Sequence, residues 1–368
     1  MIELEPSFLQ GRLVAWHHLN QAWTQRGDAG IQSLLRVMRC IQLDPLQPIA
    51  SNADLVAHAR VDGLTRGQVY DALLPEHAFE HFAKERCLID VNRFGSYRAQ
   101  SLKTPWWRTS KQHRQVSDGL LEAVLAELGE RGPLLSKDLS DQGRVDPVDW
   151  SGWKSTSKEA SMALQVLWRR CQVVVTGRST AGKLWSVPSA ALLAQPAGDF
   201  YEEGILYRIQ AIGMLPRADG PQWSILSPAR KSETVDRLIE EGKATEVRLP
   251  GSRKSWLAHP DLLAMDAPSF DERMRLLGPL DPMIWDRKLI QAVYGFEYLW
   301  EVYKPAEKRR WGWYVCPLMH RGKFVGRVEA KRSEQGIQVT RLWKEDPDFD
   351  ERAWKACLQR LERFTSTS

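Results

Sequence analysis

The chain has 368 residues, a formal net charge of +5 and a hydrophobic fraction of 43%, so it is long enough for two or three domains with a large buried core. Its five cysteines are scattered and never form a C-x-x-C pair, which argues against a disulfide framework or a zinc ribbon and favours a reducing cytoplasm. Because no apolar stretch approaches the roughly 20 residues of a membrane helix and the N-terminus does not resemble a signal peptide, we expect a cytoplasmic protein with no membrane association.

The N-terminal segment predicts two helices and then an extended stretch. The runs FLQGRLVAWHHLNQAW and GIQSLLRVMRCIQ have apolar residues at helical spacing. One face of the second helix would carry Ile31, Leu34, Leu35, Met38 and Ile41. Pro45 disfavours helical geometry at Asp44, so we expect the helix to end near Gln42. A further winged helix is plausible in this region, although the stretch after Gln42 does not have the simple hairpin pattern of a wing.

The extended stretch contains a polar pair that could carry chemistry. Residues two apart in an extended chain point to the same side, so Gln42 and Asp44 would face one space while Leu43 packs in the core. A carboxylate and an amide directed at one fixed point suit a hydrolytic reaction at a sugar carbon. A triplet of this kind is also common as an ordinary helix end, and spacing alone does not separate the two interpretations.

Other patterns argue against metal, nucleotide and serine-hydrolase chemistry. His77 and His81 lie four apart in EHAFEH and could ligate a metal from one helix face, but no third ligand has suitable spacing. We interpret this segment as an ordinary, partly exposed helix and expect no metal and no cofactor. The chain has no G-x-x-x-x-G-K-[ST] phosphate loop and no G-x-S-x-G elbow.

An internal repeat predicts two winged helices. A shift of 71 positions aligns Leu164 with Val235 and Trp185 with Trp256 without a gap. Each copy has apolar residues at helical spacing, then a β-like run, a glycine-containing turn and a short strand that carries the tryptophan. Upstream of the first copy, SDGLLEAVLAELGERG predicts a helix that ends near Gly132, and PLLSKDLS predicts a short second helix.

The C-terminal part predicts a small antiparallel sheet or barrel. After about Gly278 the sequence has short aromatic and β-branched runs, followed by a capping helix. The predicted strands are YLWEVY, WGWYVCPLM, KFVGRVEA and IQVTRLW, and the helix is DERAWKACLQRLERF. Residues 304–332 hold nine Lys or Arg and two Glu, a net charge of +7 that indicates a polyanion partner, although a solvated basic face would have the same composition.

Two segments combine aromatic and basic residues in a way that suits duplex DNA. Trp150, Trp153, Lys154 and Lys158 would lie at the start of the helix that a winged helix presents to DNA, or the tryptophans would fasten that helix to a neighbouring domain. The stretch YKPAEKRRWGWY would be a basic hairpin that reaches the duplex or an exposed turn. The residues that we expect to contact DNA are Trp153, Lys154, Lys158, Lys304, Lys308, Arg309, Arg310 and Arg327.

Several segments in order resemble one known family. IQLDPL, DWSGWKSTSKEA, GPLDPMIWDR, GFEYLWEVYKPAEKRRWGWYVCPL and GKFVGRVEAK together are similar to the AlkZ/YcaQ family of winged-helix DNA glycosylases, over roughly residues 8–345. The resemblance implies an α+β fold with three tandem winged-helix domains followed by a small C-terminal antiparallel β-barrel, arranged around a basic channel. The expected domains are residues 1–105, 106–197, 198–277 and 278–368.

The resemblance also implies a reaction and its residues. The family signature is Gln-Φ-Gln or Gln-Φ-Asp, where Φ is apolar, and Gln42-Leu43-Asp44 is similar to the YcaQ branch. Asp44 would stabilise positive charge at C1′ and activate a water that Gln42 orients. The expected partner is duplex DNA with N7- or N3-alkylated purines, including bulky adducts and interstrand crosslinks. The family carries a His-Glu-Ala stretch where this chain has Lys84-Glu85-Arg86-Cys87, which leaves the lesion preference open.

Two further expectations concern strand cleavage and competing functions. Because no lysine lies in the Gln42–Asp44 motif, we expect base release without AP-lyase activity. We expect a monomer, because the channel would form within one chain. The alternative is a winged-helix regulator or an architectural protein without catalysis. A regulator needs Arg, Asn or Gln at the start of its recognition helix to read bases, whereas this chain has Ser, Thr, Lys and Trp there.

Overall fold

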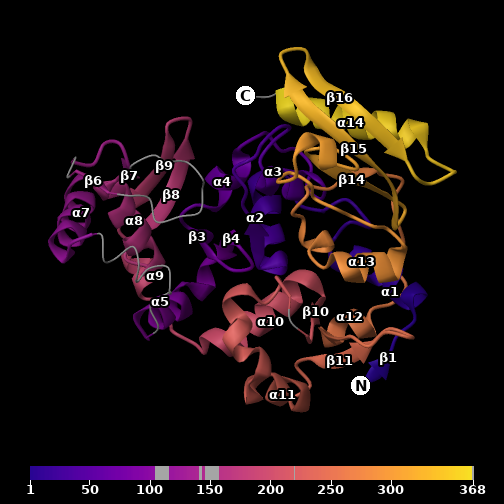
Figure 1. Ribbon diagram of the computed structural model, residues 1–368, viewed down its shortest axis with the longest axis horizontal. Helices are drawn as coiled ribbons and strands as arrows, with labels where there is room; N and C mark the ends of the chain where they lie inside the picture. The colour runs from indigo at the N-terminus through magenta and orange to yellow at the C-terminus, as the bar shows by residue number, and fades with distance from the viewer. Residues whose placement is uncertain (104–115, 141–142, 146–156, 219, 367–368) are drawn as a thin grey trace. The chain divides into compact units, whose positions relative to one another are not determined.

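The computed structural model describes residues 1–103, 116–140, 143–145, 157–218 and 220–366, and it is α+β (Figure 1). The chain forms two compact units. The first comprises residues 1–72, 82–87 and 201–368, and the second comprises residues 73–81 and 88–200. The number of winged helices, the channel and the bounds of the four expected domains stay predictions. No helix in the described ranges is long and apolar enough to cross a membrane.

The first unit carries most of the helices and the larger sheets. Its elements are β1 (Ile2–Glu3), α1 (Pro6–Trp16), α2 (Gly27–Met38), β2 (Cys40–Gln42), α3 (Asn52–His58), α4 (Gln68–Leu73), α10 (Phe200–Ile212), β10 (Met214–Pro216), η2 (Ser224–Lys231), α11 (Glu233–Glu240), β11 (Thr245–Arg248), β12 (Ser255–Ala258), α12 (Pro260–Ala264), β13 (Arg275–Leu276), η3 (Pro282–Ile284), α13 (Arg287–Tyr294), η4 (Ala306–Lys308), β14 (Val315–His320), β15 (Lys323–Ser333), β16 (Gly336–Lys344) and α14 (Glu351–Ser366).

The second unit contains α5 (Phe94–Lys103), α7 (Asp118–Arg131), β5 (Leu134–Leu135), β6 (Arg144–Val145), β7 (Ser157–Lys158), α8 (Glu159–Arg169), β8 (Val174–Ser179), β9 (Gly182–Ser186) and α9 (Ala190–Leu193). The hairpin of β3 (Ala78–Phe82) and β4 (Arg86–Asp90), followed by η1 (Val91–Arg93), belongs to this unit except at its tip, residues 82–87. Strand β2 is the neighbour of β4, whose first two residues belong to the hairpin tip in the first unit.

Helix α2 confirms the apolar stripe read from the sequence, but it ends earlier than expected. Its buried face contains Gly30, Ile31, Leu34, Leu35 and Met38. Arg39 has a φ of 63°, a backbone conformation that breaks the helix, so Ile41 lies in strand β2 instead of on the helix. Gln42 is therefore the last residue of strand β2, and the motif does not lie at the end of a helix.

The internal repeat corresponds to two helix–hairpin pairs. Leu164 of α8 and Val235 of α11 are both buried, and so are Trp185 and Trp256 of the following hairpins. Hairpin β8–β9 gains a third strand, because β5 pairs with β9. The expected short helix in PLLSKDLS is therefore wrong: Leu134 and Leu135 pair with β9, and turns follow them.

The hairpin of the second unit is fastened by a buried carboxylate. Glu80 is 2% exposed and accepts from Arg178 Nε at 3.0 Å and from Lys183 Nζ at 2.5 Å. Burial alone would raise the pKa of Glu80, but the two cations lower it below its usual range. Lys183, near the start of β9, thus forms a structural ion pair with Glu80.

The two histidines of EHAFEH do not share a helix. His77 lies in the turn after α4, and His81 lies on β3. The expected helix here is wrong because the second half of the segment pairs as a strand. The described part of the chain contains no group of three His, Cys, Asp or Glu side chains that could hold a metal ion.

The C-terminal sheet is open, so the expected barrel is wrong. Its order is β13-β14-β15-β16, and four strands are too few to close around a core. Helix α14 packs along β16 and covers the sheet (Figure 1). The run YLWEVY forms no strand; instead Tyr298 is buried and its hydroxyl donates to Val315 O at 2.7 Å.

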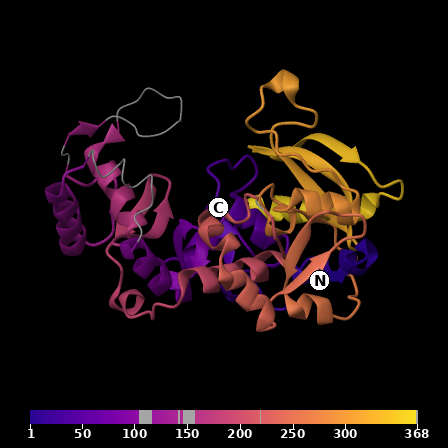
Figure 2. The same cartoon turned by 60° about the horizontal axis from the view of Figure 1, so that its bottom comes forward.

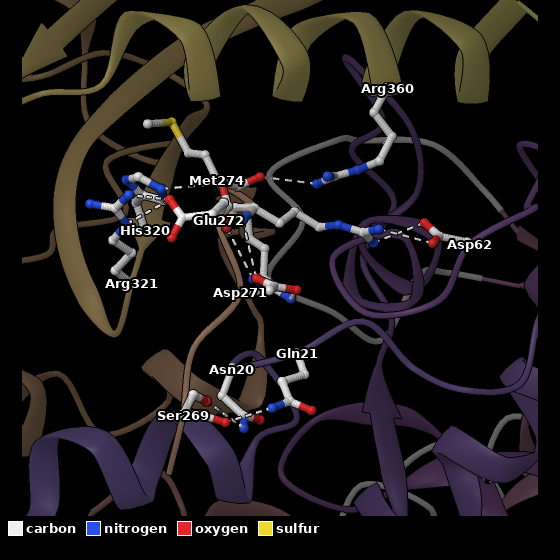
Figure 3. A network of polar contacts seen from close by, with 12 residues as sticks. Asn20, Gln21, Asp62, Ser269, Asp271, Glu272, Met274, His320, Arg321 and Arg360 are labelled. Carbon is white, nitrogen blue, oxygen red and sulfur yellow. Dashed lines mark hydrogen bonds and ion pairs between the residues drawn. The ribbon is translucent and has the colours of Figure 1, made fainter.

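A polar network holds the segment before β13 against the loop that follows α3 and against helix α14 (Figure 3). Arg273 donates to both carboxylate oxygens of Asp62, at 2.9 and 3.0 Å. Arg275 forms a similar paired contact with Asp271, and Arg360 of α14 donates to Met274 O at 3.1 Å. Contacts with Asp62, with Asp271 and with Arg360 of α14 therefore fix the segment that leads into β13.

Because two histidines are buried, we expect the free energy of unfolding to fall in acid. Burial, with Arg60 nearby, lowers the pKa of His17 to about 3, and burial together with Arg360 lowers the pKa of His58 to about 3. The unfolded chain takes up these protons below its ordinary pKa near 6.5, whereas the native chain does not. The free energy of unfolding should therefore fall by up to about 1.4 kcal/mol per pH unit for each histidine as the pH drops from 6.5 toward 3.

Denaturant titrations at pH 7.5, 6 and 5 check this prediction. The variant His58→Phe keeps a ring against Phe364, which stacks on His58 with centroids 4.5 Å apart, and it should show a shallower dependence on pH. An equal slope for wild type and variant would show that His58 titrates normally in the native state.

Candidate active site

The site is built on the end of strand β2. Gln42 is 4% exposed, and its backbone carbonyl accepts a hydrogen bond from Asn52 Nδ2 at 2.8 Å. The N–H of Leu43 donates to Arg86 O at 2.8 Å, which continues the pairing with β4 by one residue. The chain is thus extended at the motif, as the sequence predicted, and Leu43 is buried.

Asp44 follows as a half-buried carboxylate. Its Oδ1 accepts from the N–H of Leu46 at 2.8 Å, which fixes the orientation of the side chain. Burial raises the pKa of Asp44, and the Leu46 hydrogen bond opposes that rise. Its Oδ2 has no hydrogen-bond partner among the described residues, so one carboxylate oxygen is available to a substrate or a water.

Asn52 holds the motif in place and was missed by the sequence reasoning. Besides its bond to Gln42, it accepts from the N–H of Leu280 through Oδ1 at 3.2 Å. A Cβ at Gly278 would lie only 2.7 Å from this oxygen, so glycine is required for the close approach. The GPLDPM segment, which the resemblance singled out, therefore supports the back of the site.

Lys84 reaches the same place from the tip of the β3–β4 hairpin. Its Nζ donates to Gln42 Oε1 at 3.2 Å and lies 5.2 Å from the centroid of the Trp285 ring. The motif itself contains no lysine, as the sequence shows. The fold adds what the sequence does not reveal, because the hairpin brings an amine to the glutamine side chain.

Two tyrosines lie within electrostatic reach of Asp44. Burial raises the pKa of Tyr303, and the carboxylates of Asp44 and Glu85 raise it further. Burial also raises the pKa of Tyr314 well above its usual range, and Cys316 and Asp44 add to this. The Tyr314 hydroxyl is buried without a hydrogen-bond partner in the described part of the chain, whereas Tyr303 is 84% exposed.

Tyr303 is the first residue of a basic loop, residues 303–313, and Tyr314 directly follows it. The loop stands out from the sheet (Figure 2). Glu301 closes the loop: it accepts from Lys304 Nζ at 2.8 Å and from the N–H of Trp311 at 2.8 Å. Burial alone would raise the pKa of Glu301, but these donors and the N–H of Arg310 lower it to about 2. The loop is therefore held by an ionised carboxylate at neutral pH.

The expected DNA contacts on this loop are at the surface. Lys304, Lys308 and Arg310 are exposed, and Arg309 is partly exposed. Arg310 pairs with Glu297 at 2.5 Å, and Arg309 Nε donates to Lys304 O at 2.7 Å. Glu301 and Glu297 thus each pair with one of these cations, and the exposed Lys308 and partly exposed Arg309 add positive charge to the surface of this loop.

The remaining expected contacts have different positions. Arg327 is 1% exposed, pairs with Glu345 and has its guanidinium 3.8 Å from the centroid of the Trp311 ring. It therefore supports the sheet from inside and presents no charge to DNA. Trp153 and Lys154 lie outside the described residues. Lys158 ends strand β7, directly before α8.

Comparison with known proteins identifies the family of this chain. The family model "DNA glycosylase AlkZ-like" matches residues 35–364. The fold is similar to that of the solved structure of the Streptomyces sahachiroi DNA glycosylase AlkZ, with a TM-score of 0.58, 18% identity, and coverage of 99% of this chain and 98% of that one. Because the family model spans most of the sequence, the chain belongs to the AlkZ-like DNA glycosylase family.

Proposed function

We propose that the chain removes N7- and N3-alkylated purines from duplex DNA by hydrolysing the N-glycosidic bond. The observation that carries the proposal is Asp44: a half-buried carboxylate with one oxygen fixed by Leu46 and the other unpaired, next to a loop of exposed cations. The resemblance adds bulky adducts and interstrand crosslinks to the substrates, since unhooking a crosslink is base excision at a tethered purine.

The proposed chemistry takes place at the sugar. An alkylated purine carries a positive charge, so its bond to C1′ is already weakened and the base leaves without an acid. Asp44 stabilises the oxocarbenium character of C1′ and takes a proton from the attacking water. The Gln42 amide can donate and accept at once, so it orients that water, and Asn52 keeps its backbone in place.

DNA binding is assigned to charge and to two aromatic side chains. Lys304, Lys308, Arg309 and Arg310 would neutralise phosphates, together with Lys154 and Lys158 of the other segment. Trp153 of that segment would contact the sugar–phosphate backbone. Tyr303 is exposed next to Asp44 and would stack on a base or sugar at the lesion, where aromatic rings replace lost base stacking.

The test is release of free base from a duplex with a single N7-methylguanine, or from one with a nitrogen-mustard crosslink. Release by wild type supports the proposal. Tight duplex binding with no release from either substrate would contradict it and would favour the regulator or architectural protein.

Tyr314→Phe separates function from stability. The buried hydroxyl has no partner, so its removal relieves a desolvation cost, and the melting temperature should stay the same or rise. We expect the hydroxyl to donate to the sugar or to the attacking water during the reaction. Base release by the variant should therefore fall by about 10-fold, the effect of one hydrogen bond of roughly 1.4 kcal/mol. Calorimetry and the N7-methylguanine assay together check this, and unchanged turnover would remove Tyr314 from the mechanism.

A further inference from the structure

Lys84 is presented at the tip of a tight hairpin. The N–H of Ala83 donates to Glu85 O at 2.7 Å, which closes the turn around Lys84. The side chain then lies against the Trp285 ring and ends 3.2 Å from Gln42 Oε1. A flexible four-carbon side chain is thereby held at the glutamine that, in the proposed function, lies next to C1′.

The surroundings of Lys84 make its amine easier to deprotonate than an ordinary lysine. Burial lowers the pKa of Lys84 to about 8. Cys87 and Glu85 oppose the shift, while the guanidinium groups of Arg208 and Arg287 add to it. At pH 7 roughly a tenth of the amine is therefore unprotonated, against less than about a thousandth for an ordinary lysine, and an unprotonated amine is the form that attacks a carbonyl.

We propose that Lys84 is a nucleophile that gives the chain a second activity, cleavage of the DNA strand at abasic sites. The proposal rests on the proposed function for the position of the sugar, and it replaces the expectation of base release alone. Hydrolysis of the N-glycosidic bond leaves an abasic sugar in equilibrium with its open-chain aldehyde, so the product of the first reaction is the substrate of the second.

The chemistry balances without a co-reactant. Lys84 Nζ attacks C1′ of the aldehyde and forms an iminium, and the carbonyl oxygen leaves as water. The proton at C2′ passes to water, and its electron pair forms the C2′–C3′ double bond as the C3′–O bond breaks. The 3′-side phosphate leaves with the bonding electrons. Water then hydrolyses the imine, which releases the unsaturated aldehyde and restores the amine.

A simpler role would be orientation of Gln42 by the Lys84 ammonium. Arginine separates the two roles, because a guanidinium can donate to Gln42 Oε1 and keep the positive charge but cannot form an imine. A purely positioning residue should therefore be rescued by Lys84→Arg, whereas a nucleophile should not.

The experiment uses a duplex with one preformed abasic site, so it does not depend on base release by this chain. Borohydride reduces an imine to a stable protein–DNA crosslink, which is scored on a denaturing gel. Wild type should be trapped and should cleave the strand, and Lys84→Arg should lower both by about 100-fold or more, as expected for loss of a covalent nucleophile. The control Lys323→Arg changes an exposed lysine of β15 and should behave as wild type.

The pH profile and the base-release assay complete the test. Trapping by wild type should rise with pH as the amine loses its proton and should level off above about 8. Base release by Lys84→Arg should fall far less than its trapping does. Trapping by Lys84→Arg equal to wild type would assign the imine to another amine, such as the N-terminus, and overturn the proposal, as would no trapping of wild type. Trapping without base release would leave this proposal standing and contradict the glycosylase.

Discussion

Replacing Asp44 with asparagine should lower the rate of base release by about 1,000-fold, which is the usual range for loss of a general base or a preorganised electrostatic group. Asparagine has nearly the same shape, and its Oδ1 can still accept from the N–H of Leu46, now 2.8 Å from Asp44 Oδ1. The loop geometry should therefore survive while the negative charge opposite C1′ is lost. Only the transition state carries full charge at C1′, so duplex affinity should change little.

Single-turnover base release and a duplex-binding titration measure the two quantities separately. Because burial raises the pKa of Asp44, wild-type activity should be present above that raised pKa and lost as the pH falls through it. The Asp44→Asn variant should show no such acid limb. Full turnover by the variant would show that the carboxylate is not the base, whatever its position.

The extended geometry at Gln42 and Asp44 could be predicted from the sequence because its determinants are local, whereas the catalytic role of the two residues comes from the family resemblance and stays a proposal. Pro45 restricts the preceding backbone, and the apolar stripe of α2 fixes where the helix packs. These effects act within a few residues of Gln42 and Asp44. The hydrogen bond from the Leu43 N–H to Arg86 O confirms the extended geometry that they predict at the motif. The early helix end was missed because it depends on a positive φ at Arg39, a conformation that no residue type at that position signals.

The rest of the site depends on contacts between distant segments. Lys84 is 42 positions from Gln42, and Asn52 is 228 positions from Leu280, so no periodicity connects them. Tyr314 appeared to belong to a strand, and only the fold shows a buried hydroxyl without a partner.

Arg327 illustrates the opposite error. Its place in a basic segment suggested DNA contact, but both faces of β15 are covered at this point, and Arg327 is buried against Glu345 and two aromatic rings. Composition reports how much charge a segment has and does not report which face of the sheet carries it. The same limit applies to the barrel, since strand-forming runs indicate a sheet without determining whether its edges meet.

Replacing Asp281 with alanine should lower the free energy of unfolding by about 3–5 kcal/mol, the cost of leaving one partner of a buried ion pair uncompensated. Arg60 and Asp281 are both fully buried, with nitrogen–oxygen distances of 2.7 and 2.9 Å. Arg60 also donates to His17 O and Val56 O, so its charge cannot leave the core without unfolding the packing around α3.

The matched control is Glu202→Ala, which removes a surface ion pair with Arg237 at 2.7 Å and should change stability by less than about 1 kcal/mol. Denaturant unfolding of both variants measures the contrast. Asp281 also accepts from the N–H of Met283, three positions after the Leu280 N–H that Asn52 receives. Loss of the buried pair should therefore loosen the support behind Gln42, and base release should decline with temperature earlier than in wild type. Equal stability of Asp281→Ala and wild type would mean that water enters to solvate Arg60, and the ion pair would then have no part in holding the site.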